Sequence, residues 1–130
     1  MTDVPVPKAI VILGASRDRA KYGNRAVRAY TVSGSTVYAV NPKAGPELEG
    51  VKAFASIKDV PPGATDVASI YTPPAVTATL LPDLASYGIK RAYFNPGAET
   101  EELVDQARTL GIEPILACSV TAIGKSPDDY

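Results

Sequence analysis

The sequence predicts the α/β fold class, with a single doubly wound, mostly parallel sheet and helices on both faces. Short apolar runs rich in β-branched residues alternate with helix-permissive stretches along the chain. Such alternation is typical of strand-helix units whose parallel strands are covered on both sides. The chain has 130 residues, of which 45% are hydrophobic. We therefore expect one domain over residues 1–130, with a core that needs no disulfide.

Six extended segments are expected in the sheet, because β-branched and aromatic residues are concentrated in each of them. They cover residues 9–13, 36–40, 51–54, 67–71, 92–94 and 114–117. Residues 41–50 contain two prolines and two glycines. An ordered loop is therefore expected between the second and third segments.

Helices are expected in the intervals, over residues 24–30, 56–60, 74–87 and 100–110. The last of them has Glu101 and Glu102 in its first turn and Gly111 after its end, which suits the helix dipole and a left-handed cap. Pro82 lies inside the helix over residues 74–87 and removes a backbone donor. A kink or break is therefore expected there.

The two ends of the chain, residues 1–7 and 119–130, are expected to be peripheral or frayed. The first residues lack a basic region followed by an apolar stretch of signal-peptide length, and no apolar run reaches membrane-spanning length. We therefore expect a cytoplasmic protein that does not associate with membranes.

Charge and side-chain chemistry exclude several classes of function. Lys and Arg number 13 and Asp and Glu 14, so no broad positive field attracts nucleic acid. Cys118 is the only cysteine, which excludes an internal disulfide and a cysteine-based zinc cluster. The chain has no histidine, the usual general base and metal ligand. We predict no metal site and no catalytic residue.

Small, polar and rigid residues follow four of the predicted strands. These exits read Gly14-Ala15-Ser16, Asn41-Pro42-Lys43, Thr72-Pro73-Pro74 and Asn95-Pro96-Gly97. The carboxyl ends of parallel strands meet at one edge of a sheet, so these loops are expected to line one crevice. Proline, glycine and asparagine are also ordinary turn residues, and a single exit indicates little. Four such exits together favour a ligand site, in which Ser16, Asn41, Thr72 and Asn95 offer hydrogen bonds.

Gly14, directly after the first strand, predicts a turn over which a phosphate binds. The free N–H groups and the positive end of the following helix favour an anion. The dinucleotide pattern G-x-G-x-x-G is not matched, since positions 16 and 19 hold Ser and Arg. Arg17, Lys21 and Arg25 are spread across the loop and the first helical turn. These three cations either meet phosphates or form a solvated surface.

The residues after the second strand point to a phosphorylated adenosine. An NAD-binding domain usually has Asp or Glu at this place, where the carboxylate holds the ribose hydroxyls. Here the sequence reads Asn41-Pro42-Lys43 instead. A carboxylate would repel a phosphate on that ribose, whereas Lys43 would attract it. The expected ligand is therefore coenzyme A or NADP.

Taken together, these segments resemble the small CoA-binding proteins, whose Rossmann-like domain is similar to the nucleotide-binding part of the succinyl-CoA synthetase α subunit. The resemblance covers about residues 9–116. The segments that show the resemblance are residues 11–18 (Val-Ile-Leu-Gly-Ala-Ser-Arg-Asp), 21–25 (Lys-Tyr-Gly-Asn-Arg), 40–43 (Val-Asn-Pro-Lys), 50–53 (Gly-Val-Lys-Ala), 73–74 (Pro-Pro) and 95–98 (Asn-Pro-Gly-Ala).

The resemblance implies a site for coenzyme A or an acyl-CoA. The glycine turn would lie against the pyrophosphate with two lysines as charge partners, the second exit would border the adenosine, and the fourth strand's exit, Thr72-Pro73-Pro74, the pantetheine. The candidate binding residues are Gly14, Ala15, Ser16, Arg17, Lys21, Tyr22, Asn24, Val40, Asn41, Pro42, Lys43, Thr72, Pro73, Pro74, Asn95 and Gly97.

Two features depart from the pattern of the family. Related sequences commonly have Gln where Asn95 stands. They also end the last strand with Asp-Arg-Cys and a basic, histidine-bearing stretch, where this chain has Ala117-Cys118-Ser119 and a histidine-free tail. Cys118 either packs as a small buried hydrophobe or exchanges with the coenzyme thiol as a mixed disulfide.

Binding of coenzyme A without catalysis is the function that the sequence favours. One alternative is an NADP-dependent redox enzyme, although the chain offers no second domain and no proton donor besides tyrosine or lysine. Another is a nucleotide-responsive interaction subunit, because related domains are joined to larger acyl-CoA synthetases. A protein partner or a homo-oligomer would accompany the second alternative.

Overall fold

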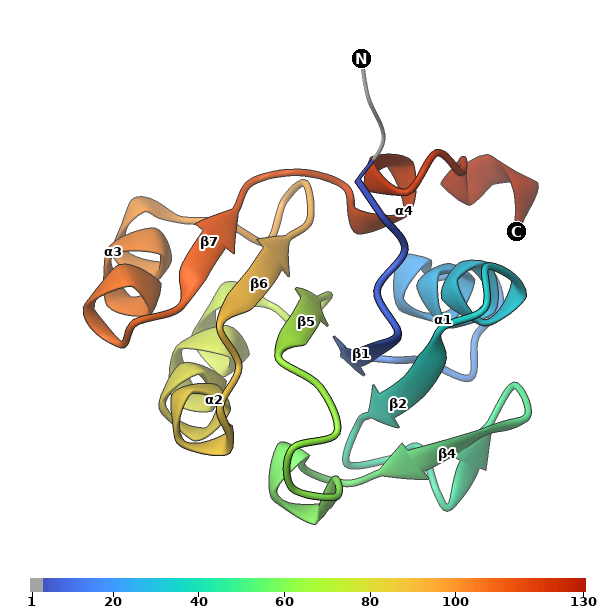
Figure 1. Cartoon of the computed structure of the whole chain (residues 1–130), viewed down its shortest axis with the longest axis horizontal. Coiled ribbons are helices and arrows are strands. Elements are labelled where there is room, and N and C mark those ends of the chain that lie inside the picture. Colours follow the sequence, from blue (N-terminus) through green and yellow to red (C-terminus); the bar gives the residue numbers. More distant parts are fainter. Residues whose placement is uncertain (1–3) are drawn as a thin grey trace.

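A computed structural model describes residues 4–130 of the chain, and at its centre lies one seven-stranded sheet (Figure 1). The strands are β1 (Ala9–Leu13), β2 (Thr36–Val40), β3 (Glu47–Leu48), β4 (Val51–Phe54), β5 (Val67–Ile70), β6 (Arg91–Phe94) and β7 (Glu113–Ile115). Their order across the sheet is β3-β4-β2-β1-β5-β6-β7. Every neighbouring pair is parallel except β3 and β4.

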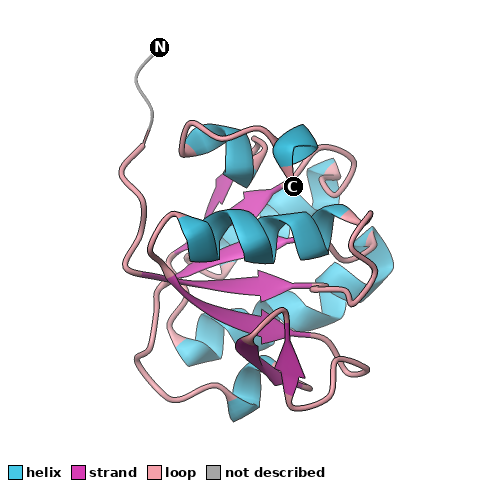
Figure 2. Ribbon diagram, turned by 90° about the vertical axis from the view of Figure 1, so that its right-hand side faces the viewer, coloured by secondary structure: helices cyan, strands magenta, loops and turns pink. Residues whose placement is uncertain are grey.

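Helices cover both faces of this sheet, as the sequence predicts (Figures 1 and 2). The helices are α1 (Tyr22–Val32), α2 (Pro74–Tyr87), α3 (Glu101–Thr109) and α4 (Ser119–Ala122), with short 3-10 turns η1 (Ile57–Asp59) and η2 (Pro127–Asp129). α1 and α4 pack together on one face, while α2 and α3 pack together on the other. The predicted doubly wound α/β class is confirmed. Within residues 4–130, no helix combines the length and apolar character needed to cross a membrane.

Alternation along β1 builds two separate cores. Ile10 and Ile12 point into the cluster beneath α1, whereas Val11 and Leu13 point into the cluster beneath α2 and α3. All four side chains are at most 1% exposed. A strand that is buried on both faces reads as a continuous apolar run. This burial explains why the sequence identifies β1 with the same bounds as the structure.

The predicted loop over residues 41–50 contains a strand, β3, that the sequence pattern does not indicate. β3 pairs antiparallel with β4 through a two-residue turn at Glu49 and Gly50. Both turn residues have positive φ, 50° for Glu49 and 80° for Gly50. This conformation suits the twist of a tight hairpin. A two-residue strand is too short to give a periodic signal.

The predicted break at Pro82 is not observed, because α2 runs unbroken from Pro74 to Tyr87. Proline at this position leaves the carbonyl of Ala78, four residues earlier, without its helical donor. The side-chain amide of Gln106 in α3 donates to that carbonyl at 3.1 Å. Packing of α3 against α2 therefore supplies the hydrogen bond that the proline ring removes.

Residues 119–130 also differ from the expectation of a frayed end, because they pack against α1 (Figure 1). Val120 and Ile123 join the core cluster under α1, at 2% and 7% exposure. The hydroxyl of Tyr30 donates to the carbonyl of Ser119 at 2.7 Å. Near the other end of the chain, the amide of Val4 donates to the carbonyl of Ala122 at 2.9 Å.

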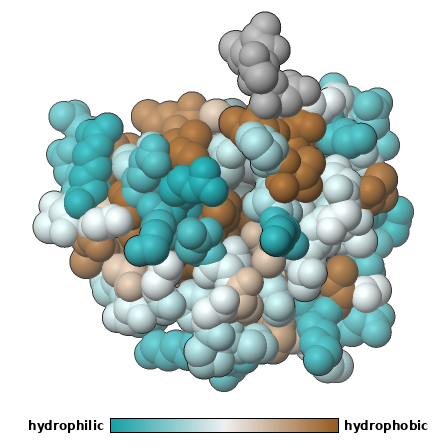
Figure 3. Space-filling view, in the orientation of Figure 1, coloured by the Kyte–Doolittle hydropathy of each residue, from teal (hydrophilic) through white to brown (hydrophobic). Residues whose placement is uncertain are grey.

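The surface is of mixed polarity over most of the face seen in Figure 3, with apolar side chains gathered near α4 and the first described residues. Among the described residues, the large apolar side chains that remain exposed are Val4, Val6, Tyr22, Val32, Val76 and Leu116. Some exposed apolar surface is normal for folded proteins, so this exposure by itself identifies no binding surface.

Candidate functional site

The main pocket lies beside β1, at the point where the order of successive strands across the sheet reverses. β1 has β2 on one side and β5 on the other, and the helices that follow β1 and β5 lie on opposite faces. In doubly wound sheets, ligands bind in the crevice outside the carboxyl ends of such strands. A pocket of about 850 Å³ occupies this crevice, a volume typical of small-molecule and cofactor sites.

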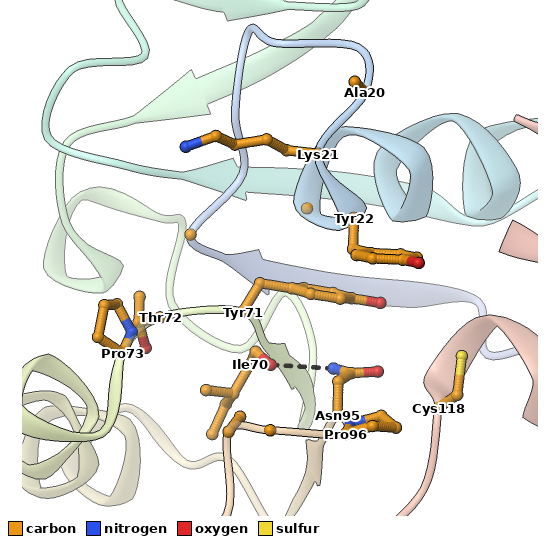
Figure 4. A pocket seen from close by; sticks show the side chains of 14 residues that line it. Ala20, Lys21, Tyr22, Ile70, Tyr71, Thr72, Pro73, Asn95, Pro96 and Cys118 are labelled. Atoms are coloured by element: carbon orange, nitrogen blue, oxygen red, sulfur yellow. Dashed lines mark hydrogen bonds between the residues drawn. The ribbon is translucent and has the colours of Figure 1, made fainter.

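Residues from four strand exits line the pocket (Figure 4). They are Gly14, Ala20, Lys21, Tyr22 and Gly23 after β1, Ile70, Tyr71, Thr72 and Pro73 at the end of β5, Asn95, Pro96, Gly97 and Ala98 after β6, and Cys118 after β7. The predicted meeting of the exits at one edge is therefore observed for the loops after β1, β5 and β6. Seven of the candidate residues line the pocket: Gly14, Lys21, Tyr22, Thr72, Pro73, Asn95 and Gly97.

The two ends of the pocket differ in chemistry. The ammonium group of Lys21 points toward one end, on the side of Thr72 and Pro73, while the hydroxyl of Tyr71 points the opposite way, toward Cys118 (Figure 4). The first-turn amides of Tyr22 and Gly23 donate no hydrogen bond within residues 4–130. Unpaired amides at a helix N-terminus, together with a cation, favour an anion at the Lys21 end.

Two glycines allow the β1–α1 turn to come close to its neighbours. Gly14 has φ +80°, and a Cβ on it would lie 2.8 Å from the carbonyl carbon of Tyr71. Gly23 has an ordinary helical φ, but a Cβ on it would overlap the carbonyl oxygen of Gly14. Gly14 therefore serves the backbone packing of β1 against β5 as well as the pocket. Gly23, which is not among the candidate residues, is required for α1 to start this close to the turn.

Arg17 does not point free into the pocket as the candidate set implies. Its guanidinium donates to the backbone carbonyls of Ala44 and Glu47, which lie in the segment after β2. Five fixed donors on one planar group suit this bridging role. Arg17 therefore fastens the loop after β1 to the loop after β2.

Asn24 is likewise an internal residue and does not line the pocket. It is fully buried, and its side-chain amide donates to the carbonyl of Ser16 at 2.8 Å and to the carboxylate of Glu49 at 3.0 Å. The same carboxylate pairs with Arg19 at 2.6 Å. The β3–β4 turn therefore holds the β1–α1 loop through the side chain of Glu49.

Four polar side chains that were expected to face a ligand make hydrogen bonds inside the protein. Ser16 Oγ accepts from the amide of Asp18, the Asn41 amide donates to the carbonyl of Ala15, and Thr72 Oγ1 lies 2.6 Å from Thr77 Oγ1. The fourth, Asn95, uses its whole amide within the protein. These groups shape the exits, and the sequence alone does not distinguish that role from ligand binding.

The remaining candidates lie around the pocket and do not line it. Ala15 and Val40 are buried in the core, Pro74 begins α2, and Pro42 and Lys43 are exposed on the loop after β2. Among residues 4–130, neither Lys21 nor Lys43 has an acidic partner within ion-pair distance. Arg25, by contrast, lies 3.8 Å from Asp128 and stacks over the ring of Tyr22 at 5.2 Å.

Tyrosines near the inner end of the pocket are held in the neutral form. Burial raises the pKa of Tyr71, and the hydrogen bond with the Ser119 hydroxyl partly offsets that rise. Burial also raises the pKa of Tyr30. At neutral pH the Tyr71 hydroxyl therefore carries its proton and is available as a donor.

Tyr71 and Cys118 complete the inner end of the pocket. The sequence predicts Tyr71 only as the last residue of the extended segment over residues 67–71, where an aromatic residue is more often buried, and it leaves two alternatives for Cys118. Tyr71 lies one residue before the predicted exit Thr72-Pro73-Pro74, which is the one signal that placed it near a ligand. Cys118 is partly buried, packs against the core cluster beneath α1 and carries a free thiol.

Fold and site together define an α/β protein of the Rossmann-like class, with a glycine turn after its first strand and Asn41-Pro42-Lys43 in place of an acidic residue after its second. The chain belongs to the CoA binding domain family, whose model matches residues 8–123. The resemblance to CoA-binding proteins predicted from the sequence is confirmed.

Relatives and solved structures agree with this assignment. The chain is 33% identical over 104 residues to an ADP-forming acetate-CoA ligase II of Archaeoglobus fulgidus, covering 78% of this chain and 15% of the ligase. It is 34% identical over 85 residues to the α subunit of the corresponding Pyrococcus furiosus ligase, covering 65% and 18%. A conserved hypothetical protein from Pyrococcus furiosus superimposes with a TM-score of 0.80 at 32% identity, covering 88% of this chain and 97% of the other.

A domain of a longer enzyme has the same fold. The dinucleotide-forming acetyl-coenzyme A synthetase 1 of Ca. Korarchaeum cryptofilum superimposes with a TM-score of 0.72 at 33% identity, over 87% of this chain and 26% of that one. The chain thus spans less than a fifth of the two curated ligases above and about a quarter of this synthetase. The chain is therefore related to the CoA-binding domain of these ligases, and their catalytic activity belongs to the longer proteins.

Proposed function

We propose that this protein binds coenzyme A or an acyl-CoA in the pocket at the carboxyl edge of the sheet, without catalytic residues of its own. The observation that carries the proposal is the turn after β1. It combines a close-packed glycine with helix amides and a Lys21 ammonium that have no partner among residues 4–130, beside a pocket of about 850 Å³. Membership of the CoA binding domain family supports the same ligand.

In this proposal the diphosphate lies at the Lys21 end and the pantetheine runs along the exits of β5 and β6. Gly14, Lys21 and Tyr22 hold the diphosphate side, Thr72 and Pro73 border the part of the pantetheine next to the diphosphate, and Gly97 borders the part that leads to the thiol. The candidates outside the pocket act indirectly, since Arg17 and Asn24 fix the loop on which the diphosphate would lie. Rigid walls of this kind reduce the entropy that is lost on binding.

Lys43 is proposed to read the 3′-phosphate of the adenosine. It is exposed on the loop after β2, where a domain specific for NAD has a carboxylate. Arg17 ties this loop to the turn after β1 through the carbonyl of Ala44. The two phosphate-binding loops are therefore held in a fixed relationship, although Lys43 itself does not line the pocket.

Isothermal titration calorimetry with coenzyme A, 3′-dephospho-coenzyme A and NADPH tests the proposal. We expect binding of coenzyme A, about tenfold weaker binding of the dephospho form, and no saturation with NADPH. Lys43→Ala should remove the difference between the first two ligands, while Lys21→Ala should weaken both. Lys90→Ala, at the start of β6 on the opposite edge, is the matched control. Tight binding of NADPH alone would establish the alternative of a redox protein.

A cytoplasmic location and a protein partner or homo-oligomer belong to the proposal as well. They rest on the sequence pattern and on the longer relatives in which such domains occur. Size-exclusion chromatography with light scattering, with and without coenzyme A, measures the oligomeric state. Affinity purification with and without added coenzyme A tests for a ligand-dependent partner, and an unchanged partner list would weigh against ligand-gated assembly.

A further inference from the structure

A line of buried polar groups leads from β6 to the inner end of the pocket. It is formed by the side chains of Asn95, Ser69, Ser119 and Tyr71. Ser69 lies in β5 and Tyr71 follows β5 directly, while Asn95 follows β6 and Ser119 begins α4. Ser69 and Ser119 are 0% exposed and Asn95 is 4% exposed. Buried donors of this kind need acceptors, so the direction of each hydrogen bond can be worked out in turn.

The orientation of the Asn95 amide is fixed by two backbone groups of known polarity. Its Nδ2 lies 3.0 Å from the carbonyl of Ile70, which only accepts. Its Oδ1 lies 2.9 Å from the amide of Ser119, which only donates. The second hydrogen on Nδ2 therefore points at Ser69 Oγ, 2.9 Å away. Ser69 Oγ is thus an acceptor in this contact.

The hydroxyl protons then follow in one direction. The Ser69 hydroxyl must donate to its other neighbour, Ser119 Oγ at 2.7 Å. Ser119 in turn donates to the hydroxyl oxygen of Tyr71 at 3.2 Å. Reversing either of these two contacts would leave the hydroxyl proton of Ser69 or of Ser119 buried without an acceptor among these groups, which is costly. Tyr71 therefore accepts from within the protein, and its own proton is left for the pocket.

This proton faces the end of the pocket that is farthest from the phosphate turn. Figure 4 shows the Tyr71 ring lying along the pocket, with its oxygen directed away from the Lys21 ammonium and toward Cys118. Burial keeps the hydroxyl neutral at physiological pH, because it raises the pKa of Tyr71. A ligand whose phosphates lie at the Lys21 end would place its opposite end near this donor.

We propose that the Tyr71 hydroxyl donates a hydrogen bond to the thioester carbonyl of an acyl-CoA, so that the site prefers acyl-CoA over free coenzyme A. The inference rests on the proposed function and deepens it. A thiol sulfur is a weak acceptor, so free coenzyme A would leave the Tyr71 proton poorly paired once water is displaced. A carbonyl oxygen accepts fully and completes the line that starts at Asn95.

The first test compares three ligands on the unaltered protein by calorimetry: acetyl-CoA, free coenzyme A and the thioether S-ethyl-CoA. The thioether matches the acetyl group in size but lacks the carbonyl oxygen. We expect acetyl-CoA to bind about tenfold more tightly than either of the others. Equal affinity for acetyl-CoA and the thioether would overturn the inference, and absence of binding for all three would instead overturn the proposed function.

The second test removes the donor. Tyr71→Phe should lower the affinity for acetyl-CoA about tenfold and leave the affinities for coenzyme A and S-ethyl-CoA within about threefold. Tyr38→Phe, a tyrosine of β2 outside the pocket, is the matched control and should change none of them. An equal loss for all three ligands would contradict a contact with the thioester, and would assign the donor to an amide of the pantetheine instead.

Infrared spectroscopy of bound acetyl-CoA labelled with ¹³C at the carbonyl gives a readout that a structural role would not change. A hydrogen bond from Tyr71 lowers the stretching frequency of the carbonyl. The frequency should therefore be lower in the unaltered complex than in the Tyr71→Phe complex. The same frequency in both complexes would show that Tyr71 does not touch the carbonyl.

Discussion

The side-chain amide of Gln106 in α3 donates to the backbone carbonyl of Ala78 in α2, at 3.1 Å. This is the carbonyl that a donor at position 82 would pair with in a regular helix, and position 82 is a proline. One side chain of a neighbouring helix thus completes the hydrogen bonding of α2, which passes through Pro82 without a break.

The first prediction tests this repair with a double-mutant cycle. Gln106→Ala should lower the free energy of unfolding by about 1 kcal/mol, because the carbonyl of Ala78 loses its donor. In a Pro82→Ala background the same change should cost much less, because the backbone amide restored at position 82 can then donate to that carbonyl. Urea denaturation of the four proteins measures the coupling. Additive effects would show that the two positions are independent.

The second prediction concerns Gly23 in the first turn of α1. Alanine is favoured over glycine in helices by about 1 kcal/mol, so helix propensity alone predicts that Gly23→Ala stabilises the protein. We expect the opposite, a loss of about 2 kcal/mol, because the new methyl group overlaps the carbonyl oxygen of Gly14. Thermal and urea denaturation decide the sign.

Gly34→Ala is the comparison for that experiment. Gly34 has φ +99° and open space around it, so its replacement costs about 1 kcal/mol from backbone conformation alone. It should leave ligand affinity unchanged, since Gly34 lies between α1 and β2 and outside the pocket. Gly23→Ala should in addition weaken binding of coenzyme A. If Gly23→Ala stabilises the protein, the close approach of α1 to the turn is wrong.

The third prediction separates the roles of two cations in the same loop. Arg17→Ala should lower the free energy of unfolding by about 1 to 2 kcal/mol, because two backbone carbonyls lose a charged donor. Lys21→Ala should leave stability within about 0.5 kcal/mol, since the ammonium has no acidic partner in the described part of the chain. It should instead weaken coenzyme A binding strongly and reduce its dependence on salt. Strongly weakened binding with unchanged stability in Arg17→Ala would indicate that Arg17 contacts the ligand.

The fourth prediction is a loss of stability at alkaline pH. Burial raises the pKa values of Tyr30, Tyr71 and Tyr93 in the folded protein above their ordinary value of 10.0. A raised folded-state pKa means that the neutral form is favoured by folding. The stabilisation is therefore complete below about pH 10 and is lost as the pH rises above that value.

Tyr30→Phe tests this pH dependence at a tyrosine that has no exposed surface. The variant should be about 1 kcal/mol less stable at neutral pH, because the hydrogen bond to the Ser119 carbonyl is lost. Its stability should fall less steeply than that of the unaltered protein between about pH 9 and about pH 11. Denaturation midpoints across this range provide the measurement, with Tyr38→Phe as control. Parallel curves would contradict the shift at Tyr30.

The fold was predictable because its strongest signals are local. β1 is buried on both faces and reads as five continuous apolar residues, and the bounds of α3 follow from Glu101 and Glu102 in its first turn and Gly111 after its end. Residues whose structure depends on distant partners were not predictable. β3 has two residues and needs β4, and α2 continues through Pro82 because Gln106 lies beside it.

The location of the site could be predicted from the sequence, but the role of each side chain could be predicted only in part. The meeting of the exits after β1, β5 and β6 follows from the parallel pattern, and these exits do line one pocket. A sequence does not show whether Arg17 reaches a ligand or a carbonyl thirty residues away in the hairpin strand β3. Nor does it show that Asn95 and Ser119 position Tyr71, because that requires the packing of α4 against the sheet.

The margins of the sheet have a consequence for behaviour at high concentration. On one side the outermost strand, β3, has only two residues, and on the other side β7 carries Pro114 at its centre. An edge strand of two residues offers little length for pairing, and the backbone nitrogen of Pro114 cannot donate a hydrogen bond to an incoming strand. Neither edge strand readily pairs with a strand of another polypeptide, so both edges of the sheet disfavour the growth of fibrils by edge-to-edge pairing.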